Sequence, residues 1–252
     1  MDSDDRPERA DGRVDVSDLT IVIPFRHDGP ERLENLTAVL GHLGRACAGL
    51  HVVVLEHGPR LVAGHPGETP GVDWHATRAD GPFHRTALLN QGIETLTDRP
   101  LAASWDTDTL VYPAALAAAL GRLRAGAGLA FPFDGTFHDI SGAARARVID
   151  GGGDISALPP ETVLAGRAAK QGDVVCTNSN SVGGVVLFRR DAFTEAGGYH
   201  EGFVAWGFED AEIAERMATF GHGRLRVEGF PLLHLAHPRQ GRRDGWYAAR
   251  RA

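Results

Sequence analysis

The hydrophobic pattern of the chain alternates between short apolar runs and stretches in which apolar residues recur every three or four positions. The short runs are rich in β-branched residues, which is typical of buried strands. They lie at residues 19–25, 50–55, 101–105, 128–133, 182–188, 224–227 and 231–235. The stretches with helical spacing predict helices that begin at Pro30, near residue 86, at Pro113, at Arg190 and just after residue 210. We therefore expect an α/β fold.

The order of these segments predicts how the sheet is built. Residues 19–55 follow the order strand, helix, strand, which predicts a parallel pair joined by a right-handed crossover. In open α/β sheets, ligands bind at the carboxyl ends of the strands. Arg26, Glu56 and Asp106 each stand at the end of a predicted strand, so we expect them to converge on one site.

The pattern weakens at both ends of the chain and in its middle. Residues 1–18 predict a disordered tail, and residues 239–252 predict a loose basic tail. Residues 19–238 between them are long enough for one domain. Within this domain, residues 134–173 have weak periodicity apart from a helical stretch at 160–169, which indicates a functional lid or disorder.

Composition and charge narrow the class of protein. The 252 residues are 42% hydrophobic and 23% charged, as in an ordinary soluble domain. A formal net charge of −7 argues against nucleic acid as a partner, because phosphate neutralisation needs clustered Lys and Arg. Cys47 and Cys176 are too few for a disulfide framework, which fits a reducing cytoplasm. No apolar run approaches the ~18 residues of a spanning helix, so we expect a cytoplasmic protein without a transmembrane segment.

Two aspartates and two histidines have the chemistry of a metal site. Asp106 and Asp108 form an Asp-x-Asp motif after the strand at 101–105, and on an extended backbone residues two apart face the same side. Their carboxylates suit Mg²⁺ or Mn²⁺, which commonly bridge substrate phosphates. His234 and His237 can add imidazole ligands. The alternatives are a solvated turn and structural histidines, while a zinc hydrolase is disfavoured because the sequence lacks His-Glu-x-x-His.

Residues 206–210 (WGFED) place a tryptophan and two acids at the start of a predicted helix. One of the acids, Glu209 and Asp210, can act as a general base while its neighbour holds the substrate. Acids at a helix N-terminus also favour the helix dipole, so capping is the alternative. Trp206 offers a flat apolar face for a sugar ring, and its alternative is a place in the core.

Two arginines and two phenylalanines fit a nucleotide diphosphate. Arg26 and Arg85 carry guanidinium groups that match phosphate geometry. Phe25 and Phe83 can line a uracil pocket. Surface ion pairs for the arginines and core packing for the aromatics are the alternatives. Residues 183–184 are a glycine pair in a predicted strand, where a backbone or ligand can approach closely.

These stretches together resemble the β-1,4-galactosyltransferase family and its bacterial relatives, which are inverting nucleotide-sugar transferases. Five stretches match in the same order along the chain. They are residues 21–26 (IVIPFR), 83–92 (FHRTALLNQG), 106–108 (DTD), 182–185 (VGGV) and 206–210 (WGFED). His237 follows at a suitable distance. The resemblance implies the GT-A fold, with a mixed, mainly parallel sheet flanked by helices.

The resemblance also implies a role for each matching residue. The UDP portion of a donor would contact Pro24, Phe25, Arg26, Phe83 and Arg85. The donor sugar or ribose would lie near Asp106, Gly183, Gly184 and Trp206. Mn²⁺, with Mg²⁺ as the alternative, would be held by a set drawn from Asp106, Asp108, His234 and His237. Asp210 would be the catalytic base, and Glu209 would bind acceptor and donor hydroxyls.

Four positions depart from the vertebrate pattern of that family. Phe208 stands where those enzymes have a glycine, and Ala211 replaces a third acid. Ser181 and Val182 replace the aromatic residues that precede the glycine pair. The resemblance therefore does not imply which sugar the donor carries.

The sequence thus predicts a hexosyltransferase that moves a sugar from a UDP-sugar to an acceptor hydroxyl with inversion at the anomeric carbon. The acceptor can be a glycan, a glycolipid or a small molecule. Three other functions stay open: a retaining transferase of the polypeptide N-acetylgalactosaminyltransferase kind, a nucleotide-sugar-binding module without turnover, and a metal hydrolase. The oligomeric state is left open.

Overall fold

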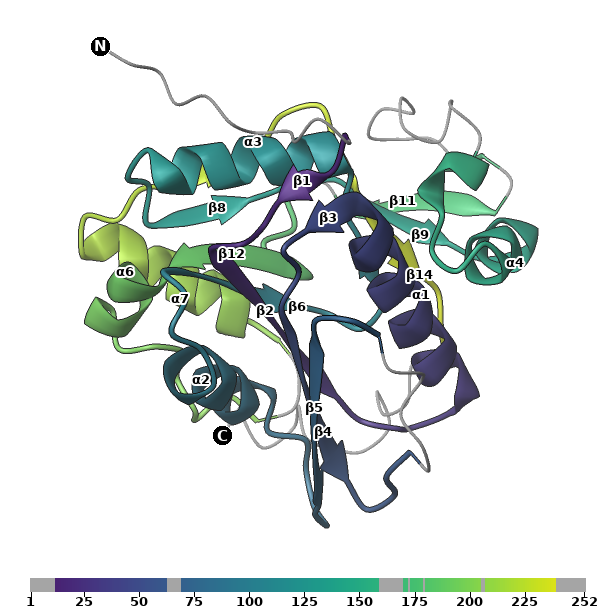
Figure 1. The fold of residues 1–252 in the computed structure, drawn as a ribbon, viewed down its shortest axis with the longest axis horizontal. Helices are drawn as coiled ribbons and strands as arrows, with labels where there is room; N and C mark the ends of the chain where they lie inside the picture. The colour runs from purple at the N-terminus through teal and green to yellow at the C-terminus, as the bar shows by residue number, and fades with distance from the viewer. Residues whose placement is uncertain are drawn as a thin grey trace, which may run out of the picture.

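A seven-stranded sheet forms the centre of the molecule, with the order β13–β8–β12–β6–β2–β4–β5 (Figure 1). The computed structural model describes residues 12–62, 69–158, 170–171, 173–178, 180–204 and 207–238. The strands of this sheet are β2 (Leu19–Phe25), β4 (Val52–Gly58), β5 (Val72–Arg78), β6 (Leu101–Trp105), β8 (Leu129–Phe131), β12 (Val185–Arg189) and β13 (Arg224–Arg226). Only β12 runs antiparallel to its neighbours among these described strands. The sheet is therefore mixed and mainly parallel, as expected.

The middle strands form because their residues are apolar on both faces. All seven residues of β2 and all five of β6 are buried. Strands covered on both sides appear in the sequence as continuous hydrophobic runs. The edge strand β5 is instead mostly exposed, which explains why the hydrophobic pattern did not reveal it.

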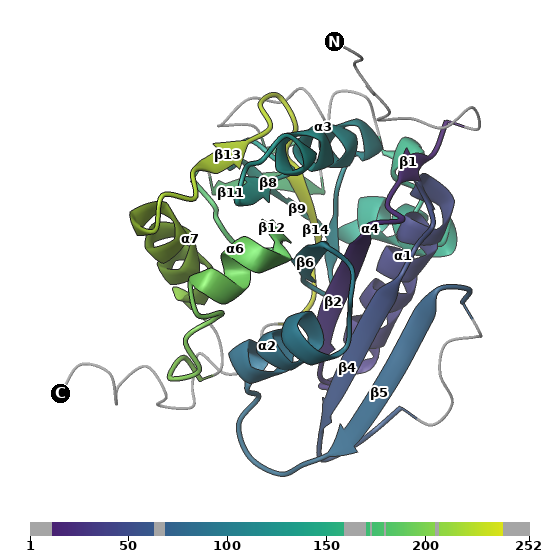
Figure 2. The same cartoon turned by 60° about the vertical axis from the view of Figure 1, so that its left-hand side comes forward.

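Helices cover both sides of this sheet. They are α1 (Pro30–Ala46), α2 (Arg85–Thr95), α3 (Pro113–Arg124), α4 (Gly142–Asp150), α6 (Arg190–Glu195) and α7 (Glu209–Thr219), with a short 3₁₀ helix at Ile155–Ala157. Figures 1 and 2 show α1 on one side of the sheet and α2, α6 and α7 on the other. None of the helices in the described part of the chain is both long and apolar enough to cross a membrane.

A second sheet of five strands brings the end of the domain to its middle. Its order is β10 (Lys170–Gln171), β11 (Val174–Asn178), β9 (Phe137–Ile140), β14 (Leu232–Leu235) and β7 (Thr109–Leu110). Because β14 lies between β7 and β9, His234 is paired in register with Thr109 on one side and Asp139 on the other. This pairing places the late histidines beside the turn that follows β6.

The ordered fold begins earlier than residue 19, so the predicted N-terminal boundary is wrong. β1 (Val14–Asp15) pairs in parallel with β3 (Cys47–Ala48). Val14 and Val16 are fully buried in the core. Two valines in an otherwise polar segment are enough to bury a short strand, although they are too few to produce a periodic pattern. Residues 1–11 and 239–252, the rest of the predicted tails, lie outside the described residues.

The weakly patterned segment at residues 134–173 has regular structure where it is described. It contains β9, α4, the 3₁₀ helix and β10. Elements this short span too few residues to show a clear period, so the weak pattern did not mean disorder. The helical stretch expected at 160–169 lies outside the described residues.

Candidate active site and metal centre

Three side chains from two distant parts of the sequence meet at the second sheet. Asp108 lies in the turn between β6 and β7, His234 lies on β14, and His237 follows β14. One ligand atom from each residue lies within 4.8 Å of those of the other two. Nε2 of His237 is 3.1 Å from Oδ2 of Asp108, and Nε2 of His234 is 3.6 Å from Oδ1. A carboxylate and two imidazoles that face one another form a candidate site for a divalent metal ion.

The second nitrogen of each histidine is engaged, which fixes the orientation of both rings. Nδ1 of His234 lies 2.5 Å from Oδ1 of Asp139, and Nδ1 of His237 lies 3.0 Å from the carbonyl oxygen of Pro238. Metal-binding histidines ordinarily donate their second N–H to a carboxylate or carbonyl in this way. The Nε2 atoms are therefore the ones left for a metal, and the residues present fit such an ion.

The charges around Asp108 favour its ionised form. Burial alone would raise its pKa, but the two histidines and Arg32 outweigh burial and hold the pKa of Asp108 well below its usual range. Nη1 of Arg32 donates to Oδ2 of Asp108 at 2.6 Å. Burial lowers the pKa of His234, but Asp108 and Asp139 outweigh it, so the net shift is upward. An ionised carboxylate is the form that binds a metal.

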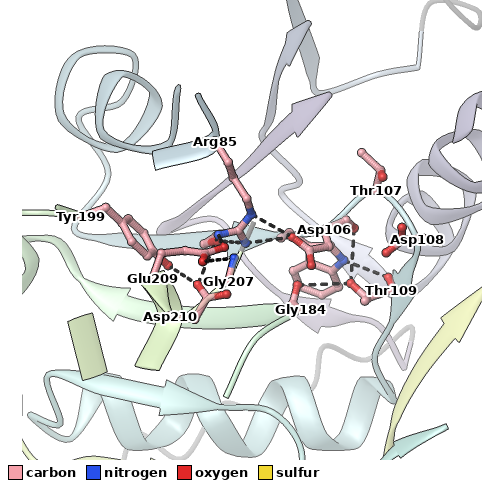
Figure 3. A network of polar contacts seen from close by, with 12 residues as sticks. Arg85, Asp106, Thr107, Asp108, Thr109, Gly184, Tyr199, Gly207, Glu209 and Asp210 are labelled. Carbon is pink, nitrogen blue, oxygen red and sulfur yellow. Dashed lines mark hydrogen bonds and ion pairs between the residues drawn. The ribbon is translucent and has the colours of Figure 1, made fainter. Parts of the chain in front are cut away.

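Asp106 does not join this group, contrary to the prediction that both aspartates face one site. Residues 107–108 form a turn, so the alternation of an extended chain does not apply to them. The Asp106 carboxylate points instead to Arg85, whose Nη2 and Nε lie 2.8 Å and 3.3 Å from Oδ1 (Figure 3). In this geometry Asp106 is a partner of Arg85 and not a ligand of the candidate metal site.

Arg85 is the centre of a buried polar cluster (Figure 3). Its side chain is only 7% exposed. Besides Asp106, Nη1 lies 3.3 Å from Oε1 of Glu209 and 3.4 Å from Oδ1 of Asp210. Nη2 also donates to Oγ of Ser104 at 3.2 Å. The structure therefore places Arg85 among three carboxylates, and not on an open surface where a diphosphate would meet it.

Asp210 is a buried acid with a raised pKa. Burial is the largest cause, and the charges of Glu209 and Asp106 raise it further. Arg85 opposes this rise, as does Tyr199, whose Oη donates to Oδ1 of Asp210 at 2.9 Å. The balance raises the pKa of Asp210 to about 6. A carboxylate with a pKa closer to neutrality is a stronger base than an ordinary aspartate.

Glu209 is the first residue of α7, and its side chain forms a hydrogen bond with the backbone just before the helix. Its Oε2 accepts a hydrogen bond from the backbone N–H of Gly207 at 2.7 Å. Acids in the first turn also favour the helix dipole. Glu209 thus holds the turn that leads into α7, although no described side chain caps the first N–H groups of the helix.

The glycine pair before β12 lies close to the Asp210 carboxylate and to the backbone of Asp106. A Cβ on Gly183 would lie 2.9 Å from Oδ2 of Asp210. Gly184 has a φ of +95°, and a Cβ there would lie 2.4 Å from Leu232. The Gly184 carbonyl accepts a hydrogen bond from the Asp106 N–H at 2.8 Å. These positions therefore need glycine for the packing of the site itself.

The residues expected to meet a nucleotide divide into buried and accessible ones. Pro24 and Phe25 are buried within β2. Phe25 is 0% exposed and packs edge-on against Trp74 with ring centroids 5.7 Å apart, so core packing is the correct alternative for it. Arg26 lies just after the strand with 22% of its side chain exposed. Phe83 is partly buried against the core.

Glu56 and Trp206 are the remaining residues that were expected at the site. Glu56 is held within the scaffold, because its carboxylate accepts hydrogen bonds from the Val62 N–H at 2.7 Å and from Nε1 of Trp74 at 3.0 Å. Glu56 is therefore a structural acid. The prediction that it joins Asp106 in one site is wrong. Trp206 lies outside the described residues.

Some residues of the site were not predicted from the sequence. They are Arg32, Ser104, Asp139 and Tyr199. The role of Asp139 depends on the pairing of β9 with β14, which the sequence pattern did not reveal. Tyr199 follows a glycine pair and has no neighbour in the sequence that indicates its contact with Asp210.

The order of this sheet and the helices on both of its sides are those of the GT-A fold, which glycosyltransferases of known structure share. Residues 166–238 match the family model described as the N-terminal domain of galactosyltransferase, and this range contains Gly183, Asp210, His234 and His237. The predicted resemblance to galactosyltransferases and the predicted fold are confirmed. No curated protein matches the chain.

Solved structures of glycosyltransferases share the fold at low sequence identity. A mutant of Drosophila β1,4-galactosyltransferase 7, in complex with manganese, UDP-Gal and xylobiose, is 18% identical, with a TM-score of 0.51 over 93% of this chain and 79% of that one. GalNAc-T7 with UDP, GalNAc and Mn²⁺ is 15% identical, with a TM-score of 0.59 over 91% of this chain and 45% of that one. The mannosyltransferase PcManGT from Pyrobaculum calidifontis, with GDP-Man and Mn²⁺, is 15% identical, with a TM-score of 0.50 over 92% and 59%. The chain thus spans less than two thirds of the last two.

Proposed function

We propose that this protein is a metal-dependent inverting glycosyltransferase that moves a sugar from a UDP-sugar to an acceptor hydroxyl. The observation that carries the proposal is the arrangement around residues 106–108. Asp108 faces two histidines that suit a metal, and Asp106 connects through Arg85 to a buried acid with a raised pKa. A metal for a diphosphate and a base for a hydroxyl are the two functions that this reaction needs.

Asp108, His234 and His237 would hold the metal ion. Two imidazoles beside one carboxylate favour Mn²⁺ over Mg²⁺, which prefers oxygen ligands. The fold relatives were also solved with manganese, together with UDP-Gal in the Drosophila enzyme. When bound, the ion would act as a Lewis acid toward the departing diphosphate.

Asp210 would be the general base. Its carboxylate would remove the proton from the acceptor hydroxyl as that oxygen forms a bond to the anomeric carbon. The bond between that carbon and the UDP oxygen would break, and the electron pair would leave with UDP. With a pKa of about 6, Asp210 is mostly ionised near neutral pH and retains useful basicity.

The remaining predicted contacts complete the proposal. Arg26 and Phe83 retain some exposure and would meet the UDP portion. Glu209 would bind acceptor and donor hydroxyls, and Trp206 would stack on the sugars. The acceptor would be a glycan, a glycolipid or a small molecule.

Replacing the base tests this function. Purified protein with Mn²⁺ and a panel of UDP-sugars should release UDP, by transfer or by slow hydrolysis. Asp210→Asn should lower turnover by about 10²–10⁴-fold, because a positioned base contributes that much. Binding of UDP, measured by calorimetry, should stay within about threefold of the wild type, because Asp210 lies in the acid cluster and not in the metal centre.

The same assay contains its control and its pH test. Asp191→Asn changes an acid whose side chain is 68% exposed and pairs with Arg189, so it should turn over like the wild type.

For the wild type, kcat/KM should fall as the pH drops below about 6, where Asp210 gains its proton. Unchanged turnover in Asp210→Asn would rule out the base assignment. The anomeric configuration of the product, read by NMR, separates inversion from retention.

A further inference from the structure

The two carboxylate oxygens of Asp210 lie in different surroundings. Oδ1 accepts a hydrogen bond from Tyr199 Oη at 2.9 Å and lies 3.4 Å from Nη1 of Arg85. Among the described residues, every hydrogen bond to this carboxylate ends on Oδ1. Oδ2 faces Gly183, at which a Cβ would lie only 2.9 Å away. One oxygen is therefore held by two donors, and the other faces Gly183, where a side chain would come too close to it.

Tyr199 is rigidly placed to hold Oδ1. It is only 2% exposed, and its ring lies edge-on to Phe188 and Phe193, with centroids 6.0 Å and 5.7 Å away. A buried phenol needs a hydrogen-bond partner, and this one has Asp210 and also Ser104. Because Phe188 of β12 and Phe193 of α6 hold the ring, the phenol oxygen stays beside Asp210 at the start of α7.

Arg85 cannot do this alone. Its single guanidinium is shared among Asp106, Glu209 and Asp210, and its contact with Asp210 is the longest of its ion pairs with them. The short bond from Tyr199 is therefore the contact that sets the rotation of the Asp210 carboxylate.

We propose that Tyr199 is a positioning residue for the reaction, which holds Oδ1 of Asp210 so that Oδ2 receives the proton of the acceptor hydroxyl. The inference rests on the proposed function, because it assigns a partner to the same base. Tyr199 keeps its own proton throughout. The proton from the acceptor moves to Oδ2, the acceptor oxygen bonds to the anomeric carbon, and the sugar–UDP bond breaks with its electron pair leaving on UDP.

Tyr199→Phe tests this inference because it removes the hydroxyl and keeps the ring. The charged groups that face Asp210 are Arg85, Glu209 and Asp106, and all of them stay. A hydrogen bond to the ionised carboxylate lowers its pKa, so its loss should raise the titration midpoint of Asp210 by about one pH unit. The midpoint is read from the ¹³C carboxyl resonance, assigned as the signal missing in Asp210→Asn.

The kinetics of Tyr199→Phe should change together with the titration midpoint of Asp210. In Tyr199→Phe we expect kcat for UDP release to fall about tenfold and the acid limb of kcat/KM to move to higher pH. UDP affinity should stay unchanged. A purely structural role for Tyr199 would lower the melting temperature and leave the titration midpoint where it is.

Tyr112→Phe is the matched control. It also removes a hydroxyl from a partly buried tyrosine, whose pKa burial raises to about 12, but Tyr112 packs against Phe230 and not against Asp210. It should leave the Asp210 titration and kcat unchanged. Gly183→Ala addresses the other oxygen: a methyl group 2.9 Å from Oδ2 should lower kcat while the bond from Tyr199 persists.

The outcomes separate this inference from the proposed function. An Asp210 midpoint in Tyr199→Phe within about 0.2 units of the wild type overturns the inference. A shifted midpoint with unchanged kcat and pH profile also overturns it, because the bond would then have no part in the reaction. Failure of the proposed function shows in the wild type itself, which would neither bind UDP with Mn²⁺ nor release it from any UDP-sugar.

Discussion

Phe208 holds a backbone conformation that its side chain disfavours. Its φ of 68° and ψ of −10° lie in the left-handed region, and among the described non-glycine residues it is alone in having a positive φ. Its side chain is also 76% exposed, so burial does not offset the strain. The resemblance to galactosyltransferases places a glycine at this position, and this geometry explains that preference physically.

Phe208→Gly should stabilise the protein. Relief of the left-handed strain is worth about 1–2 kcal/mol, and the greater freedom of glycine in the unfolded chain offsets part of it. We expect the melting temperature to rise by about 1–4 °C. Phe220→Gly is the control, because Phe220 ends the same helix with an ordinary φ of −78° and is 53% exposed. Equal effects of the two substitutions would contradict the strain argument.

At the level of single residues, the sequence predicted which side chains belong to the site, but not which way each side chain points. Asp108, His234 and His237 were predicted as metal ligands from residue type and spacing, and their side chains converge in the structure. Asp106 was assigned to the same ion because an extended chain was assumed, whereas a turn sends its carboxylate to Arg85.

At the level of elements, α1 is tied to its surroundings by His42. Nε2 of this buried histidine lies 2.8 Å from the Val111 carbonyl, and Nδ1 lies 3.2 Å from the Gly153 carbonyl. Burial, aided by Arg45, lowers the pKa of His42 despite these two acceptors. The folded protein therefore favours the neutral ring, which has one N–H for two carbonyls.

This contact should make stability depend on pH. Because the folded-state pKa of His42 is lowered, its contribution is present above the unfolded value of about 6.5 and is lost as the pH falls toward the lower folded value. His42→Gln should flatten the dependence of melting temperature on pH between about 5 and 7.

His75→Gln is the control for that measurement. His75 is exposed on the edge strand β5, so its replacement should leave the pH profile of melting unchanged. A profile of His42→Gln that parallels the wild type would show that the ring titrates alike in the folded and unfolded chain.

Elements themselves were predicted well where their hydrophobic runs were long. β2, β6, α1 and α3 appear where apolar period and proline placed them. The edge strand β5, the N-terminal β1 and the short elements of residues 134–173 were missed. Their few residues owe their conformation to pairing partners far along the chain, and a local pattern does not report such partners.

At the level of the whole molecule, the candidate metal centre joins segments more than a hundred residues apart. Mn²⁺ should therefore bind the folded chain in preference to the unfolded one. At free Mn²⁺ about 100 times the dissociation constant, this adds about 2.7 kcal/mol and raises the melting temperature by about 5–10 °C. Asp108→Asn should abolish this shift and the Mn²⁺-dependent binding of UDP seen by calorimetry.

Asp73→Asn is the matched control for the metal experiment. Its side chain is 64% exposed on β5 and pairs with His51, away from the candidate metal ligands. It should respond to Mn²⁺ like the wild type. A full thermal shift in Asp108→Asn would place the metal elsewhere.

The linear chain carries the information for its strands and helices, because a hydrophobic period depends only on near neighbours. It also carries the chemical identity of the candidate metal ligands and of the proposed base. Folding determines which of these groups meet and how they face. The contact between Arg85 and Asp210 joins positions 125 residues apart, and the bond from Tyr199 to Oδ1 depends on a ring that packs against Phe188 and Phe193. Such orientations arise from packing in three dimensions, so no pattern along the chain contains them.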